Sequence, residues 1–272
     1  MVGLEGRGRD RAIDPRELEP HRDWGFSELQ SRVDSIYKEH DLSCGYGPDT
    51  MLAKLNGNAT NLKQFLRRDT DFSHIDRALA NVFIWTATFA NEGGIDIQGV
   101  LSEKFGQGCP HCYQMPCLLT KGEECIMPLG ERPTVDNAPQ TIGGWQNHFA
   151  EMYGNNYSEG FSVEAGRGVA GRILDEVGEL IAASYQDVQD EQQLVSFKDE
   201  MKPWESEIAD VLAWGFALAN GLKLRDGKYS IGKSLARQYE KGCSYCGAPK
   251  CQCKRANTFI DEMRRDNPNL IQ

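Results

Sequence analysis

The chain contains most of itself twice, and this internal duplication constrains its fold more than any other feature. Four segments of the first half recur in the same order in the second half. The clearest pair joins residues 78–91 (ALANVFIWTATFAN) to residues 207–220 (EIADVLAWGFALAN). A second pair joins residues 105–117 to residues 239–251 and has identical cysteine spacing in both copies. Because ordered self-similarity of this kind is typical of repeat architectures, we predict two tandem repeats.

The other two matches extend the repeats toward their N-termini. They join residues 23–37 to 144–153, where Trp24 matches Trp145 at an offset of 121, and residues 55–62 to 173–180. Across the other matches the offset varies only from 118 to 134 residues, as small loop insertions would produce. The predicted parts of the chain are a flexible N-terminal arm over residues 1–22, a first repeat over 23–126, a linker over 127–143 and a second repeat over 144–272.

Apolar residues in both repeats recur at helical spacing, and no segment alternates as a strand would. Ile173, Val177 and Leu180 illustrate the pattern in the second repeat. Pro203 suits the first turn of a helix, and Gly221 suits the C-terminal end of the same helix. We therefore predict an all-α fold. Since a few helices cannot bury their apolar faces alone, the two repeats are expected to form one helical bundle with pseudo-twofold symmetry. Two independent helical hairpins on a string are the alternative.

Composition limits the classes of partner. Forty acidic against thirty basic residues give a formal charge of −10, which argues against binding to a phosphate backbone. No segment approaches the length of apolar sequence that crosses a membrane, and the N-terminus has no apolar signal region. Nine cysteines without such a signal favour metal thiolates in a reducing compartment, so we expect a cytoplasmic protein. Assembly into a homo-oligomer is left open.

Eight of the nine cysteines fall into two sets with the same initial spacing. The sets are Cys109, Cys112, Cys117 and Cys125 in the first repeat, and Cys243, Cys246, Cys251 and Cys253 in the second. Four thiolates indicate a closed, structural zinc site in each repeat, with an iron–sulfur cluster as the alternative. Cys44 is left over, and His111 is interpreted as a bystander within the first set.

Four carboxylates carry the functional signal. Glu176 and Glu179 are three residues apart, and so are Glu207 and Asp210, so each pair shares one face of a predicted helix. If the two helices pack together, the four acids converge and repel one another unless cations lie between them. Oxygen ligands of this kind suit Mg²⁺ or Mn²⁺.

The duplication provides a control for the simpler interpretation that these acids are ordinary solvated charges. The corresponding residues of the first repeat are Asn58, Asn61, Ala78 and Asn81. All four charges are therefore missing together, although the apolar and cysteine positions around them are shared. Scattered surface charges would not disappear as a set, so the control favours a functional site in the second repeat.

The spacing Glu-x-x-Glu followed by Glu-x-x-Asp, with the wording DEVGELIAA and EIADVLAW, resembles the MazG-like family of all-α nucleoside triphosphate pyrophosphohydrolases. The resemblance covers roughly residues 145–241 and recurs in degenerate form over residues 23–107. It implies that Glu176, Glu179, Glu207 and Asp210 hold Mg²⁺ and that a nucleoside triphosphate is cleaved between its α- and β-phosphates. The cysteine segments depart from the family pattern. A zinc-bearing interaction module or nucleic-acid-associated scaffold without catalysis is the alternative function.

Further residues are candidates for substrate binding. Lys233, Arg237 and Lys241 recur every four residues and form a basic face that the first repeat lacks, which suits a triphosphate clamp or a solvated surface. Trp204 lies one turn before Glu207 and could stack on a base or make a hydrophobic contact at the helix start. Trp214 and Asn220 have counterparts in the acid-free repeat, so we interpret them as core and helix-end residues.

Overall fold

The computed structural model describes residues 23–68, 71–117, 125, 138–154, 161–190 and 201–253, the last five residues of the 161–190 segment by backbone alone. In this part of the chain the protein is all-α, with eight helices and no strand. The first repeat supplies α1 (Phe26–Cys44), α2 (Pro48–Arg68), α3 (Phe72–Glu92) and α4 (Ile97–Phe105). The second repeat supplies α5 (Ile142–Tyr153), α6 (Val163–Asp190), α7 (Pro203–Asp226) and α8 (Ile231–Tyr239). The predicted N-terminal arm and most of the predicted linker lie outside the described residues.

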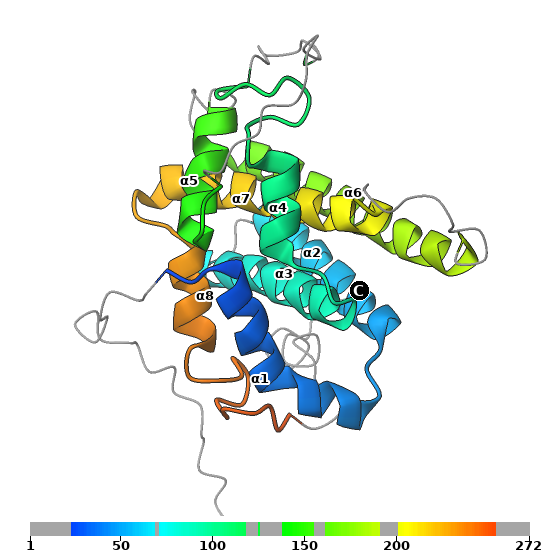
Figure 1. The fold of residues 1–272 in the computed structure, drawn as a ribbon. Coiled ribbons are helices and arrows are strands. Elements are labelled where there is room, and N and C mark those ends of the chain that lie inside the picture. The colour runs from blue at the N-terminus through cyan, green and yellow to red at the C-terminus, as the bar shows by residue number, and fades with distance from the viewer. Residues whose placement is uncertain are drawn as a thin grey trace, which may run out of the picture.

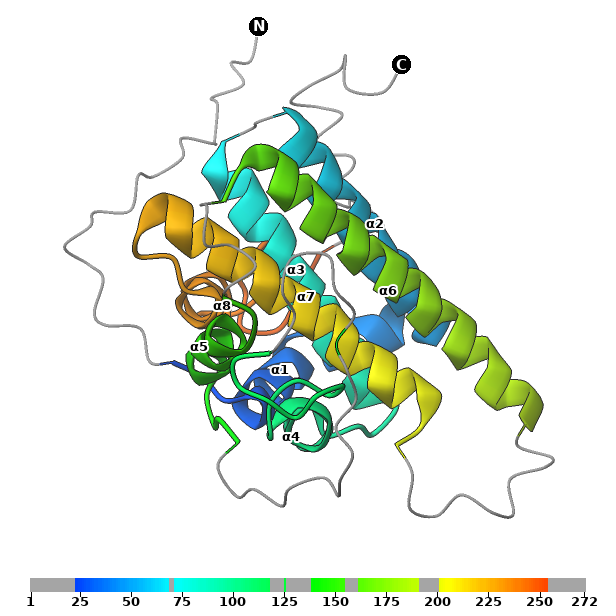
Figure 2. The same cartoon turned by 90° about the horizontal axis from the view of Figure 1, so that it is seen from above.

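The four long helices α2, α3, α6 and α7 form the centre of the molecule and run alongside one another (Figures 1 and 2). α2 packs between α3 and α6, and α7 completes the ring by contacting both. The apolar stripes predicted from helical spacing face this centre: Leu55, Leu62, Ile173, Val177 and Leu180 are all fully buried. The two repeats therefore share one core, which excludes two hairpins on a string.

The short helices cross from one repeat to the other. α4 of the first repeat packs on α7 of the second, and α8 of the second repeat packs on α3 of the first. α1 lies against α3 and α4, while α5 lies against α7 and α8 (Figure 2). Every contact of one repeat thus has a counterpart in the other, as a pseudo-twofold relation between the repeats requires.

Matching hydrogen bonds define the register of the first helix in each repeat. Gln30 donates to Ile95 O and accepts from Ile97 N, and Gln146 makes the same pair of bonds with Tyr229 O and Ile231 N. Gln30 therefore corresponds to Gln146 at an offset of 116. The predicted match of Trp24 with Trp145 was wrong, since Trp24 precedes α1 whereas Trp145 lies inside α5. Both indoles are buried, which explains why a match of residue types was misleading.

The predicted limits of α7 were correct at one end and wrong at the other. Pro203 is its first residue, as expected from its fixed φ angle. Gly221 does not end the helix, which continues to Asp226 and is capped by Gly227 with a φ of 74°. A Cβ atom at residue 221 would lie 2.1 Å from the ring of Phe161. Glycine is needed there for close packing rather than for a helix end.

A pair of glycine substitutions tests the contact between α3 and α7. A Cβ atom at Gly215 would lie 2.7 Å from the ring of Phe83, which is fully buried against Phe216 at 5.2 Å between centroids. We expect Gly215→Ala to lower the free energy of unfolding by ~1–2 kcal/mol because overpacking outweighs the gain in helix propensity.

The matched control is Gly168→Ala in α6, where a Cβ atom would meet no atom within 4 Å. There we expect a gain of ~0.5–1 kcal/mol from helix propensity alone. Urea unfolding of both variants measures the difference, and equal effects of the two substitutions would contradict the close approach of α3 and α7.

Candidate metal centre

The acids predicted from the sequence converge where α6 packs on α7. Each of Glu176, Glu207 and Asp210 places a carboxylate oxygen within 4.8 Å of the others, so the three could hold a metal ion. Glu179 is exposed and lies outside this group, although its charge raises the pKa of all three. The packing of α6 on α7 therefore brings three of the four predicted acids together, and Glu179 lies at the margin of the group.

Burial and mutual repulsion set the electrostatics of the acids. Burial, followed by the charges of Asp210 and Glu179, raises the pKa of Glu176 to about 7. The pKa of Glu207 is raised by burial and by Asp210, and that of Asp210 is raised chiefly by burial. Among the described residues, Glu207 Oε2 is a buried oxygen without a hydrogen-bond partner. An unpartnered buried oxygen beside two other carboxylates fits a cation, because burial without a partner is otherwise unfavourable.

Trp214 has a role at this site that the sequence comparison did not identify. Its Nε1 donates a hydrogen bond of 3.1 Å to Glu176 Oε1 and its side chain is only partly buried. The interpretation as a core residue, based on its counterpart Trp85, was therefore incomplete. Asn220 agrees better with its interpretation: it is buried, and its Nδ2 donates to Gln146 O.

Two basic side chains of the first repeat act on the acids. Lys104 Nζ, on α4, lies 2.5 Å from Asp210 Oδ2 and 2.7 Å from Ser206 Oγ. The charge of His111 also lowers the pKa of Asp210. Neither interaction was predicted, because the cations were expected in the repeat that carries the acids.

The equivalent position in the first repeat is occupied by neutral hydrogen bonds. Asn81 Nδ2 donates to Asn58 Oδ1 at 3.0 Å and to Tyr245 Oη at 3.3 Å, while Tyr239 Oη donates to Asn81 Oδ1 at 2.5 Å. The side chains of Asn58, Asn81 and Tyr239 are buried. Where the second repeat gathers carboxylates, the first repeat is closed by amides and phenols from both repeats.

The predicted basic clamp does not lie beside the acids. Lys233 and Arg237 are on α8 and Lys241 follows it, and α8 packs on α3 and α5. Arg237 is bonded to Asp76 of α3 at 2.5 Å, next to the amide cluster of the first repeat. The crossing of α8 onto the other repeat carries the basic face away from the carboxylates of its own repeat.

Trp204 makes the hydrophobic contact rather than presenting an open stacking surface. Its ring meets Phe89 edge to face at 6.0 Å, and a Cβ atom at Gly93 would lie 2.5 Å from it. Both neighbours belong to the C-terminal end of α3. Trp204 therefore anchors the start of α7 to the first repeat.

Both cysteine sets form compact groups that could hold a metal ion. The sulfur atoms of Cys109, Cys112, Cys117 and Cys125 lie within 4.8 Å of one another, as do those of Cys243, Cys246, Cys251 and Cys253. The turns that present them are alike. In each set the backbone N–H of the first cysteine donates to the carbonyl oxygen of the residue five positions later. The residue four positions after the first cysteine, Tyr113 or Gly247, has a positive φ angle. His111 and Cys44 are in neither group.

Each cysteine set is bonded to the first helix of the other repeat. Cys117 N donates to Met152 O at 2.8 Å, and Cys251 N donates to Ile36 O at 2.7 Å. Tyr37 Oη also donates to Cys243 Sγ at 3.7 Å. The two sets therefore join the repeats crosswise.

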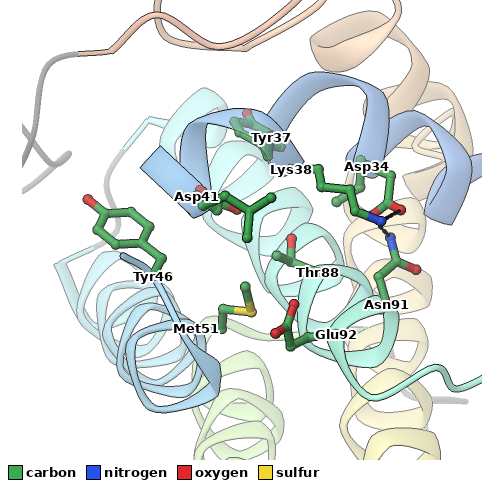
Figure 3. Close-up of a pocket in the computed structure, with 11 residues that line it drawn as sticks. Asp34, Tyr37, Lys38, Asp41, Tyr46, Met51, Thr88, Asn91 and Glu92 are labelled. Atoms are coloured by element: carbon green, nitrogen blue, oxygen red, sulfur yellow. Dashed lines mark hydrogen bonds and ion pairs between the residues drawn. The ribbon is translucent and has the colours of Figure 1, made fainter. Parts of the chain in front are cut away.

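A separate pocket lies in the first repeat between α1 and the ends of α2 and α3 (Figure 3). Asp34, Asp41 and Glu92 line it, but they are not among the groups that could hold a metal ion in the described part of the chain. In the second repeat Gly221, the counterpart of Glu92, is covered by Phe161. The pocket is therefore a feature of the first repeat and does not include the converged acids.

None of the helices in the described segments is long and apolar enough to cross a membrane. Comparison of the chain with protein-family models, with curated proteins and with solved structures gives no significant match.

The raised pKa of Glu176 predicts a pH-dependent difference between the protein and its Glu176→Gln variant. The folded pKa of about 7 exceeds the ordinary glutamate pKa of 4.5, so the folded protein binds the proton more tightly. Ionisation of Glu176 therefore lowers stability progressively as the pH rises from about 4.5 to about 7. Without added Mg²⁺ or Mn²⁺, we expect the stability of Glu176→Gln relative to the original protein to increase over this range.

Thermal unfolding at pH 5.0, 6.0, 7.0 and 8.0 measures this difference, and the variant itself acts as the control for all other titrating groups. The difference is expected to level off above pH 7. A difference that is constant from pH 5 to pH 8 would contradict the raised pKa.

Cysteine substitutions are expected to change metal content and stability before they change any site chemistry. Cys243→Ser or Cys246→Ser removes one of four thiolates, and metal binding to such a set contributes directly to folding. We expect each variant to lose about one equivalent of bound metal and to unfold at a lower temperature. Cys44→Ser is the matched control and should retain the metal content of the original protein. Full metal content in Cys246→Ser would contradict a four-thiolate site.

Proposed function

We propose that the chain is a Mg²⁺-dependent nucleotide pyrophosphohydrolase that cleaves a nucleoside or deoxynucleoside triphosphate to the monophosphate and pyrophosphate. The observation that supports this most is the convergence of carboxylates in one repeat, at positions that are all neutral in the other. The resemblance of the motifs around Glu176 and Asp210 to the MazG-like family gives the reaction class. Each chain would contain one such site.

The three central acids have the chemistry to hold divalent cations. Glu176, Glu207 and Asp210 place carboxylate oxygens close together, and Glu207 also has a buried oxygen without a hydrogen-bond partner, so a bound cation would relieve the repulsion and could pair with that oxygen. When bound, Mg²⁺ or Mn²⁺ would neutralise phosphate charge and lower the pKa of a coordinated water. Glu179, exposed at the margin and outside the group of three, is the carboxylate assigned to accept a proton.

Trp214 and Lys104 each contact one of the acids. The indole N–H donates to one oxygen of Glu176 and orients that carboxylate, and the lysine ammonium offsets part of the charge of Asp210. Loss of a partner that orients a metal ligand, as the indole of Trp214 does here, typically changes metal affinity or activity by ~10- to 100-fold.

For the cysteine sets we propose structural zinc. Closed four-thiolate sites favour zinc, and the occurrence of one set in each repeat argues for a role in the fold rather than in catalysis. Because each set is bonded to the opposite repeat, bound zinc would hold the two repeats together. Thiolates of this kind persist in a reducing compartment, so a cytoplasmic location is part of the proposal.

A panel of nucleoside and deoxynucleoside triphosphates with Mg²⁺ or Mn²⁺, analysed for monophosphate and pyrophosphate, tests the activity. In water labelled with ¹⁸O the label is expected in the monophosphate, which identifies attack at the α-phosphorus. We expect Glu179→Ala and Asp210→Ala to reduce turnover at least ~100-fold. Metal titration should show near-complete loss of binding in Asp210→Ala and a smaller loss in Glu179→Ala.

The duplication provides the control, because Asn61 is the counterpart of Glu179. Asn61→Ala should retain both metal stoichiometry and kcat. Salt-sensitive binding of nucleic acid without turnover of any triphosphate would instead favour the zinc-bearing scaffold. Two equivalent carboxylate metal sites per chain would contradict the assignment of the first repeat as non-catalytic.

A further inference from the structure

The strongest contact between the first repeat and the acids is made by Lys104. Its ammonium reaches Asp210 Oδ2 at 2.5 Å, Ser206 Oγ at 2.7 Å and Ser206 O at 3.3 Å, all on α7. The lysine side chain is 17% exposed and the Asp210 side chain 26%. This degree of burial distinguishes the pair from surface ion pairs, which are weak because solvent screens them.

The counterpart of Lys104 in the second repeat is neutral. At an offset of 134, α8 carries Gln238, whose Nε2 donates to Ser234 Oγ at 2.9 Å and to Asp76 Oδ2 at 3.4 Å. A cationic side chain therefore occurs at this helical position in α4, which contacts the converged acids, and not in α8. The same comparison that identified the acids thus also singles out Lys104.

Building on the proposed function, we propose that Lys104 is a displaceable counter-cation of the acidic site, which leaves Asp210 when a divalent cation binds and then binds the phosphate groups of the substrate. The first repeat accordingly contributes a substrate-binding residue to the site of the second.

The reason for displacement is that both cations bind the same carboxylate, that of Asp210. An Mg²⁺ ion lies ~2.0–2.1 Å from its carboxylate ligands. If Mg²⁺ were bound to Asp210, the Lys104 ammonium in contact with the same carboxylate would therefore be repelled by the positive charge of the metal. The lysine side chain has a flexible four-carbon stem and can turn to another anion nearby. A triphosphate held at the acids provides that anion, because metal coordination leaves other phosphate oxygens unpaired.

Two titrations of the full-length Lys104→Met variant test the proposal without using turnover. In Mn²⁺ titration by calorimetry without nucleotide, we expect binding about 3- to 10-fold tighter than in the original protein, because a competing ion pair is lost. In titration of inorganic pyrophosphate at saturating Mn²⁺, we expect binding at least ~10-fold weaker, because a phosphate-binding cation is lost. General damage to the fold would weaken the binding of both Mn²⁺ and pyrophosphate, so tighter binding of one with weaker binding of the other is specific to the proposal.

Gln238→Met is the matched control and should change neither affinity, and Lys104→Arg should retain most of the pyrophosphate binding. Unchanged or weaker Mn²⁺ binding in Lys104→Met would overturn the displacement, and unchanged pyrophosphate binding would overturn the phosphate contact. Absence of triphosphate hydrolysis by the original protein would overturn the proposed function alone, since both titrations still judge Lys104.

Discussion

The burial of apolar stripes on α2, α3, α6 and α7 is the constraint on which the rest of the structure depends. α2 and α3 of the first repeat leave a large apolar face uncovered, and so do α6 and α7, so each pair completes the core of the other. The tight contact of Gly215 with Phe83 lies at the centre of this shared core. Because the long helices must meet in this way, the short helices α4 and α8 come to lie on the opposite repeat. The cysteine sets that follow them are carried across as well.

Against this core the converged carboxylates are electrostatically unfavourable. Burial and mutual repulsion raise the pKa of Glu176, Glu207 and Asp210 together, and only part of this effect is offset by Lys104 and by the indole of Trp214. The first repeat avoids this penalty with neutral hydrogen bonds at the same place. Raised pKa values that cluster at one place are typical of functional sites, whereas the amides of the first repeat meet a structural role at the corresponding place.

The sequence was sufficient for the helices, the duplication and the acids, because these depend on local spacing. Residues three apart on one helix share a face whatever the tertiary structure, so Glu207 and Asp210 could be placed together in advance. The packing of α8 on the first repeat could not be predicted in this way, because it depends on tertiary contacts with α3 and α5 rather than on local spacing. The basic face containing Arg237 was therefore assigned to the wrong repeat, and Lys104 was missed. Gly221 is a second example. Glycine is favoured both at helix ends and where another side chain packs closely against the backbone, so the residue type alone could not distinguish the two.

The crosswise arrangement gives a physical reason for a chain to keep a repeat that has lost its acids. Lys104 and the segment containing His111 belong to the first repeat, yet both act on Asp210 of the second. The first cysteine set follows α4 directly and is bonded to Met152 on α5, so the segment after the C-terminal end of the Lys104 helix is held to the second repeat. Loss of the first repeat would remove this cation as well as half of the core. One repeat therefore provides the carboxylates, while the other provides a packing surface and a cation that offsets part of their charge.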